Sequence, residues 1–227
     1  LGVKNLDYGK LTATKGFLLD NDTLDTIVIG GPSYFAIDVV IRGRAAHAGM
    51  EPEKGISAIL AAAKAIGALR LVRLDHETTA NVGVIEGGII RNGVPDKTTF
   101  LAECRSLTHE KAEALAAEMV EIIEREVASI GAEVDITVNN LCKAVDIPDD
   151  SWPVETAKKA LRTAGVEATT TFITGFTDAS IYNNQGIEMA VVGIGARLEH
   201  STEEHIHVED MKKALTMVVE LLRLSAA

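Results

Sequence analysis

The 227-residue chain has only two cysteines, an excess of acidic over basic residues, and no long apolar run. Cys104 and Cys142 lie far apart and lack a metal-type spacing. This excludes a disulfide framework and predicts a reducing compartment. Lys and Arg number 22 against 33 Asp and Glu, which gives a net charge of −11. With no basic stripe to displace counterions from phosphates, nucleic acid is not an expected partner.

No apolar run reaches the roughly 20 residues that span a bilayer, and no signal peptide is recognisable, so we expect no membrane association. The acidity predicts a cytoplasmic protein and favours binding of cations. The chain is 47% hydrophobic, which suffices for one large domain or two small ones with real cores. It begins at Leu1 without an initiator Met, and we expect it to be part of a longer protein.

Residues 33–140 alternate between strand and helix patterns. Strands are predicted over 33–41, 78–86, 98–107 and 134–138, and helices over 52–69 and 108–130. This order is typical of a split βαβ (ferredoxin-like) domain, with a four-stranded antiparallel sheet and both helices on one face. The other face must be covered, and a homodimer is the natural solution.

Residues 141–227 alternate between helices and strands, which predicts an α/β domain with a mostly parallel sheet. The strand at 189–195 precedes a final helix, about 209–224, that carries one apolar stripe. The short apolar run 27–29 places residues 1–32 in the same domain. The predicted organisation is therefore an α/β domain made of 1–32 and 141–227, interrupted by the split βαβ domain at 33–140. The stripe of the final helix is Met211, Leu215, Val218 and Leu222.

The loop 198–207 concentrates three histidines and three carboxylates in ten residues. It leaves the end of a predicted buried strand, where α/β folds place ligands and catalytic groups. Imidazole and carboxylate are ligands that zinc takes, so the loop predicts a metal or catalytic site. The alternative is an acidic, solvated turn before the last helix.

Five other residues stand in patterns that fit either a site or ordinary structure. His47 sits among small residues, where another chain or a ligand can approach, or it only ends a loop. Asn92 begins an Asn-Gly turn. Arg105 can pair with a carboxylate two positions earlier on its strand. Asp178 can cap a helix, and Asp20 can belong to a solvated acidic turn.

Taken in order, these pieces resemble the zinc exopeptidases related to aminoacylase, carboxypeptidase G and peptidase T, and most closely the peptidase T-like tripeptidases. The resemblance covers essentially the whole chain. It implies that the split βαβ domain is a lid or dimerisation domain. The motifs that carry it are Ala46-His47-Ala48-Gly49, Asn92-x-Val94-Pro95-Asp96, Arg105, Gly175-x-Thr177-Asp178 and His200-Ser201-x-x-Glu204-x-Ile206.

The resemblance implies a site with two zinc ions, or cobalt or manganese in their place, that activates water for attack on a peptide carbonyl. His200 is then a ligand of one ion and Asp20, rather than Asp22, a ligand of the other. His47 reaches into the neighbouring subunit's site and stabilises the oxyanion, with Asn92 beside it. Substrate binding is implied for Arg105, which holds the carboxylate of the peptide, and for Thr177 and Asp178.

The family's remaining metal ligands and its Glu-Glu pair precede the matched region and are absent here. Gly93 stands where a larger residue is usual, and Phe176 where glycine is common. The sequence therefore predicts that the parent is a zinc-dependent tripeptide aminopeptidase and that this chain alone is an inactive fragment. The alternatives are a dimerisation or binding module without catalysis, and an N-acyl amino acid amidohydrolase of the same family.

Overall fold

The computed structural model describes residues 2–226, which divide into two compact units. The inserted unit is Ser33–Cys142, and the α/β unit combines the segments before Ser33 and after Cys142. The sequence predicts these boundaries after residues 32 and 140. Within the described residues, no helix is long and apolar enough to cross a membrane.

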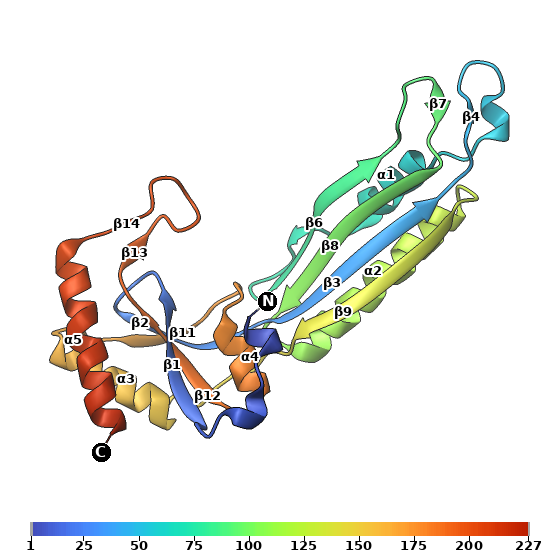
Figure 1. Ribbon diagram of the computed structural model, residues 1–227. Helices are drawn as coiled ribbons and strands as arrows, with labels where there is room; N and C mark the ends of the chain where they lie inside the picture. Colours follow the sequence, from blue (N-terminus) through green and yellow to red (C-terminus); the bar gives the residue numbers. More distant parts are fainter. Residues whose placement is uncertain (1, 227) are drawn as a thin grey trace. The chain divides into compact units, whose positions relative to one another are not determined.

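The inserted unit is an antiparallel sheet with two helices on one face (Figure 1). A short strand, β5, extends the predicted four-stranded sheet to five, in the order β5-β6-β8-β3-β9. The helices are α1 (Ala58–Ala68), preceded by the 3-10 turn Pro52–Lys54, and α2 (His109–Ala128). The strands are β3 (Ser33–Arg42), β5 (Val72–Arg73), β6 (Thr78–Gly87), β8 (Lys97–Ser106) and β9 (Glu133–Cys142).

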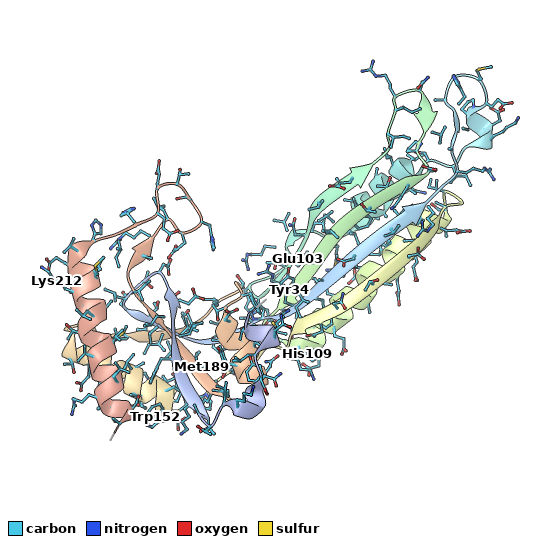
Figure 2. All side chains as sticks on the ribbon, viewed as in Figure 1. Tyr34, Glu103, His109, Trp152, Met189 and Lys212 are labelled. Atoms are coloured by element: carbon cyan, nitrogen blue, oxygen red, sulfur yellow. The ribbon has the colours of Figure 1, made fainter. Side chains whose placement is uncertain are left out.

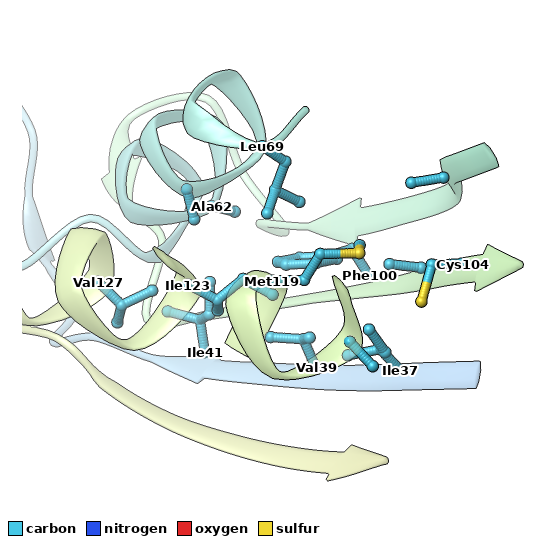
Figure 3. Close-up of a cluster of buried hydrophobic side chains, with 14 of the residues drawn as sticks. Ile37, Val39, Ile41, Ala62, Leu69, Phe100, Cys104, Met119, Ile123 and Val127 are labelled. Atoms are coloured by element: carbon cyan, nitrogen blue, oxygen red, sulfur yellow. The ribbon is translucent and has the colours of Figure 1, made fainter. Parts of the chain in front are cut away.

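Alternation along β3 builds the core of this unit (Figure 3). Every second residue from Phe35 to Ile41 is buried toward the helices, because successive side chains of a strand point to opposite faces. Phe100 and Cys104 of β8 join them, and α2 contributes Met119 and Ile123. Both cysteines of the chain are buried, and neither forms a disulfide. Burial raises the pKa of the Cys104 thiol to about 12, so this residue is an inert part of the core.

Beyond one end of this sheet, a separate two-stranded ribbon joins β4 (Ala46–His47) to β7 (Gly93–Val94). The two strands are antiparallel, with His47 opposite Gly93. Figure 1 shows both strands at the end of the sheet where β3 finishes and β8 begins.

The α/β unit is built on a second five-stranded sheet, which confirms the predicted α/β class. Two parallel pairings, β1 with β12 and β11 with β2, are the longer ones. Two short antiparallel pairings join β12 and β10 to β2. The strands are β1 (Lys15–Asn21), β2 (Thr26–Gly31), β10 (Val145–Asp146), β11 (Thr169–Phe172) and β12 (Glu188–Gly193). A small ribbon pairs β13 (Ala196–Arg197) with β14 (His205–Ile206), and 3-10 turns span Val3–Asn5 and Tyr8–Lys10.

Helices α3 (Trp152–Thr163) and α5 (Val208–Ser225) share one core with the sheet, and α4 (Asp178–Asn184) packs in a second cluster. Helix α5 is apolar on two sides. Its buried residues are Ala214, Met217 and Leu221. The stripe seen in the sequence is instead largely exposed, at Met211, Leu215 and Leu222.

Candidate active site

One open cleft of about 610 Å³ in the α/β unit brings together residues from three separate segments. Asp20, Thr177 and His200 all line it. Strand register explains how Asp20 and His200 meet. Strands β1 and β12 run in parallel, with Leu19 opposite Val192. The segments that follow the two strands therefore leave the sheet at the same edge. Asp20 lies at that end of β1, and the chain leaving β12 continues into the loop that carries His200.

The carboxylates of Asp178 and Glu199 both affect the ionisation of Asp20. Desolvation raises the pKa of the Asp20 carboxyl above its usual value, and the nearby Asp178 carboxylate raises it further. The His200 imidazole lowers that pKa, and Glu199 raises it again. The four groups are therefore close enough to interact electrostatically. Such a cluster of carboxylates is relieved by a bound cation.

The backbone around His200 is strained. Leu198 and His200 have φ values of +56° and +62°, in the left-handed region that non-glycine residues rarely adopt. Local hydrogen bonds hold this conformation: the Ser201 hydroxyl donates to the Leu198 carbonyl at 2.6 Å, and the His200 N–H donates to a Glu204 carboxylate oxygen at 3.3 Å. Strain of this kind concentrates at functional sites.

The other two histidines of this loop do not line the cleft. The rings of His205 and His207 contact each other edge to face, with 5.5 Å between their centres, and both are exposed. His205 Nδ1 lies 2.8 Å from the Glu203 carbonyl oxygen. Of the three histidines in this loop, only His200 therefore lines the cleft.

The donors in the cleft fit part of a zinc site. Asp20 offers carboxylate oxygens and His200 an imidazole nitrogen, both of which zinc binds. Among residues 2–226, however, no three His, Cys, Asp or Glu side chains are grouped so that they could hold a metal ion. Asp22 also lines the cleft, but its carboxylate accepts a hydrogen bond from the Thr23 N–H at 2.9 Å. This local turn makes Asp22 the weaker candidate of the two aspartates.

Thr177 and Asp178 come from the start of α4. Thr177 is buried at the N-cap position, and Asp178 is exposed in the first turn. The packing of Ala179 against Val28 and Val191 fixes this helix on the sheet. Phe176 lines the cleft as well, where the resemblance would place a glycine.

His47 and Asn92 come together in the inserted unit. The Ala48 N–H donates to the Asn92 carbonyl at 3.0 Å, which ties the two loops at the ends of the β4–β7 ribbon. His47 Nδ1 accepts a hydrogen bond from the Gly49 N–H at 3.2 Å. A neutral His47 ring therefore carries its proton on Nε2. Both side chains are exposed, so this N–H is available to another molecule.

Arg105 lies on the five-stranded sheet, near the end away from the β4–β7 ribbon. Strand β8 starts next to the ribbon at Lys97, and Arg105 is near its far end, roughly 27 Å away at about 3.4 Å per residue. Arg105 Nη2 forms an ion pair with Glu103 Oε2 at 2.8 Å, the same-strand pair that the spacing predicts. Its guanidinium also lies over the Tyr34 ring, 4.3 Å from the ring centre. Within one chain, Arg105 and His47 cannot contact the same small ligand.

Tyr34 and Glu199, which neighbour these residues, are not among the site residues that the sequence predicts. Glu199 could have been found, because it precedes His200 directly. Tyr34 could not, because its place opposite Arg105 depends on the register of β3 and β8.

Comparison with known proteins finds one matching family model and several similar chains. Residues 32–130 match the family model of the peptidase dimerisation domain. The uncharacterized protein YqjE of Bacillus subtilis is 36% identical over all 227 residues. The chain spans 61% of the length of that relative.

Two solved structures share both sequence and fold with the chain. The aminopeptidase PepT from Bacillus cereus is 38% identical with a TM-score of 0.86, over 100% of this chain and 61% of that one. A tripeptidase from Staphylococcus aureus is 32% identical with a TM-score of 0.91, over 99% and 60%. Residues 32–130 therefore match a peptidase dimerisation domain, and the whole chain shares its sequence and fold with about three fifths of a PepT aminopeptidase and of a tripeptidase.

Proposed function

We propose that the protein to which this chain belongs hydrolyses peptide bonds in small peptides, as a zinc-dependent tripeptide aminopeptidase. One observation carries the proposal: Asp20 and His200, 180 positions apart in the sequence, line a single cleft at the edge of the α/β sheet. The similarity to a PepT aminopeptidase and to a tripeptidase supports the choice of peptide substrates.

In this proposal, the Asp20 carboxylate and the His200 imidazole each hold a zinc ion. Bound zinc would lower the pKa of a coordinated water and polarise the scissile carbonyl. The strained loop and its hydrogen bonds keep the imidazole at the cleft before any ion arrives. The missing ligands and the general base would come from parts of the parent that this chain lacks.

The inserted unit supplies groups for the substrate. His47 Nε2–H is an exposed donor suited to the oxyanion of a tetrahedral intermediate, and Asn92 lies beside it. Arg105 binds the terminal carboxylate of the peptide through its guanidinium. Because His47 lies on the ribbon beyond one end of the five-stranded sheet and Arg105 near the other end, a homodimer through residues 32–130 would let His47 serve the partner's site.

For the chain alone, we expect no peptidase activity, because two metal donors without a general base cannot assemble the reaction site. Hydrolysis of a tripeptide by the purified 227-residue chain would contradict this expectation.

A substrate panel tests the proposed function on the full-length parent. The panel contains tripeptides, dipeptides and N-acyl amino acids, assayed with added zinc, cobalt or manganese. We expect tripeptides to give the highest kcat/KM. Preference for N-acyl amino acids would instead identify an amidohydrolase of the same family. A stable dimer that cleaves nothing in the panel would identify a binding or assembly module.

A further inference from the structure

Arg105 takes part in a three-residue arrangement on the helix-free face of the inserted sheet. Tyr34 on β3 lies directly opposite Arg105 on β8, and Glu103 precedes Arg105 by two positions on the same face. Figure 2 shows Tyr34 and Glu103 at the same end of this sheet. The Tyr34 ring stacks on the guanidinium at 4.3 Å, and the Glu103 carboxylate accepts a hydrogen bond from Arg105 Nη2 at 2.8 Å.

Tyr34 and Glu103 are also linked to each other. The Tyr34 hydroxyl hydrogen-bonds to the Glu103 side chain. Burial raises the pKa of the Glu103 carboxyl, but the hydrogen bonds from Arg105 and Tyr34 outweigh burial, and the pKa falls below its usual value. Glu103 therefore stays ionised at neutral pH. Each of the three residues therefore contacts the other two: Tyr34 stacks on Arg105, Arg105 forms an ion pair with Glu103, and the Tyr34 hydroxyl bonds to Glu103.

One buried nitrogen of Arg105 lacks a hydrogen-bond partner among the described residues, which makes the contacts with Tyr34 and Glu103 more important for the orientation of the side chain. Arg105 Nε is buried and has no hydrogen-bond partner among the described residues. An arginine is usually fixed in its plane by bonds to several of its five N–H groups. Here Nε contributes no such bond, so the orientation of the guanidinium depends on Tyr34 and Glu103. The Arg105 side chain remains 22% exposed, which leaves it within reach of a ligand.

We propose that Tyr34 and Glu103 are positioning residues that set the plane of the Arg105 guanidinium for binding the terminal carboxylate of a peptide. The proposal rests on the proposed function, which gives Arg105 that carboxylate. Tyr34 covers one face of the guanidinium and Glu103 occupies one Nη2 donor, so the ligand meets an already oriented cation. Preorganisation of this kind raises affinity by removing the cost of ordering the side chain on binding.

The test uses the full-length parent and two matched tripeptides, one with a free terminal carboxylate and one with a terminal amide. We expect the wild type to prefer the carboxylate by about 100-fold in kcat/KM, the range for a hydrogen bond to a charged group. Tyr34→Leu removes the stack and should raise KM for the carboxylate peptide by about 10-fold with kcat little changed. Cleavage of the amide peptide should not change. Tyr34→Phe keeps the stack and should retain most of the preference.

Glu103→Gln removes the charge that orients Nη2 and should also reduce the carboxylate preference. The control is Glu118→Gln, which removes an Arg–Glu pair of similar length, 2.6 Å to Arg70, on the exposed helix surface. This variant should leave kcat/KM for both tripeptides unchanged. Thermal unfolding of each variant separates misfolding from loss of orientation.

Three outcomes distinguish the positioning role of Tyr34 and Glu103, the carboxylate-binding role of Arg105 and the proposed peptidase function. If Tyr34→Leu and Glu103→Gln both fold but slow the two peptides equally, or change neither, the positioning role is overturned. If the wild type cleaves peptides without preferring the carboxylate, Arg105 is not the carboxylate site, and the inference fails while the proposed function stands. If the wild type cleaves no peptide, the proposed function itself fails.

Discussion

At the scale of single residues, the cleft depends on close backbone approaches as much as on its ionisable groups. Gly193 ends β12 opposite Asn21, immediately beyond Asp20. A Cβ on Gly193 would collide with the backbone carbonyl of Thr23, in the turn that follows Asp20. Gly67 in helix α1 is different, because a Cβ there would meet nothing within 4 Å.

These two glycines give a matched pair of substitutions. We expect Gly193→Ala to destabilise the protein by about 2 kcal/mol or more, since backbone atoms must move to admit the methyl group. Gly67→Ala should stabilise it by about 0.5–1 kcal/mol, because alanine favours the helix. Denaturant unfolding of the 227-residue chain measures both. Equal effects of the two substitutions would contradict the close approach at Gly193.

A residue-scale prediction on pH concerns Lys111, whose ammonium bonds to Asp75 at 2.8 Å and to Glu77 at 2.7 Å. Hydrogen bonds from Lys111 lower the pKa of both carboxyls below their usual values. Groups with a lowered folded-state pKa stabilise the protein above their unfolded pKa, about 4. This stabilisation is lost as the pH falls through the folded pKa.

Lys111→Met should therefore be less stable than the wild type at pH 7, and the gap should shrink below about pH 4. Lys212→Met is the control, because within residues 2–226 the ammonium of Lys212 pairs only with Glu209, in an exposed contact. It should change little at either pH. If the wild type and Lys111→Met differ in unfolding free energy as much at pH 3 as at pH 7, the carboxylates of Asp75 and Glu77 are not the cause of the difference.

At the scale of elements, strand patterns were more informative than helix patterns. Alternation along β3 and β8 predicts the two strands, and the structure buries one face of each because that face packs on helices. Helix α5 shows the limit of such reasoning: it is apolar on two sides, and periodicity alone cannot say which side the chain covers. The loop 198–207 shows another limit, since the left-handed backbone at Leu198 and His200, which separates His200 from His205 and His207, leaves no mark in the sequence.

The two sides of α5 give the prediction at this scale. Met217 is fully buried and Leu215 is 64% exposed. We expect Met217→Ala to cost about 2–5 kcal/mol of unfolding free energy. Leu215→Gln should stay within about 0.5 kcal/mol. Comparable losses from both substitutions in the 227-residue chain would show that the stripe of Met211, Leu215 and Leu222 is covered.

At the scale of the whole molecule, the chain combines an inserted unit that matches a peptidase dimerisation domain with a second, α/β unit. Sequence order predicts this organisation, because the split βαβ pattern interrupts an α/β alternation. The meeting of Asp20 with His200 needed the family resemblance, since no local pattern joins residues so far apart. Tyr34 beside Arg105 escaped both kinds of reasoning, because it depends on strand register.

The most direct test of the account is the metal content of the full-length parent, measured together with tripeptide hydrolysis. The account predicts that Asp20→Asn and His200→Ala each reduce bound zinc and lower kcat by about 100-fold or more, whereas Asp22→Asn in the same cleft leaves both nearly unchanged. Full zinc content and full activity in His200→Ala and Asp20→Asn would contradict it.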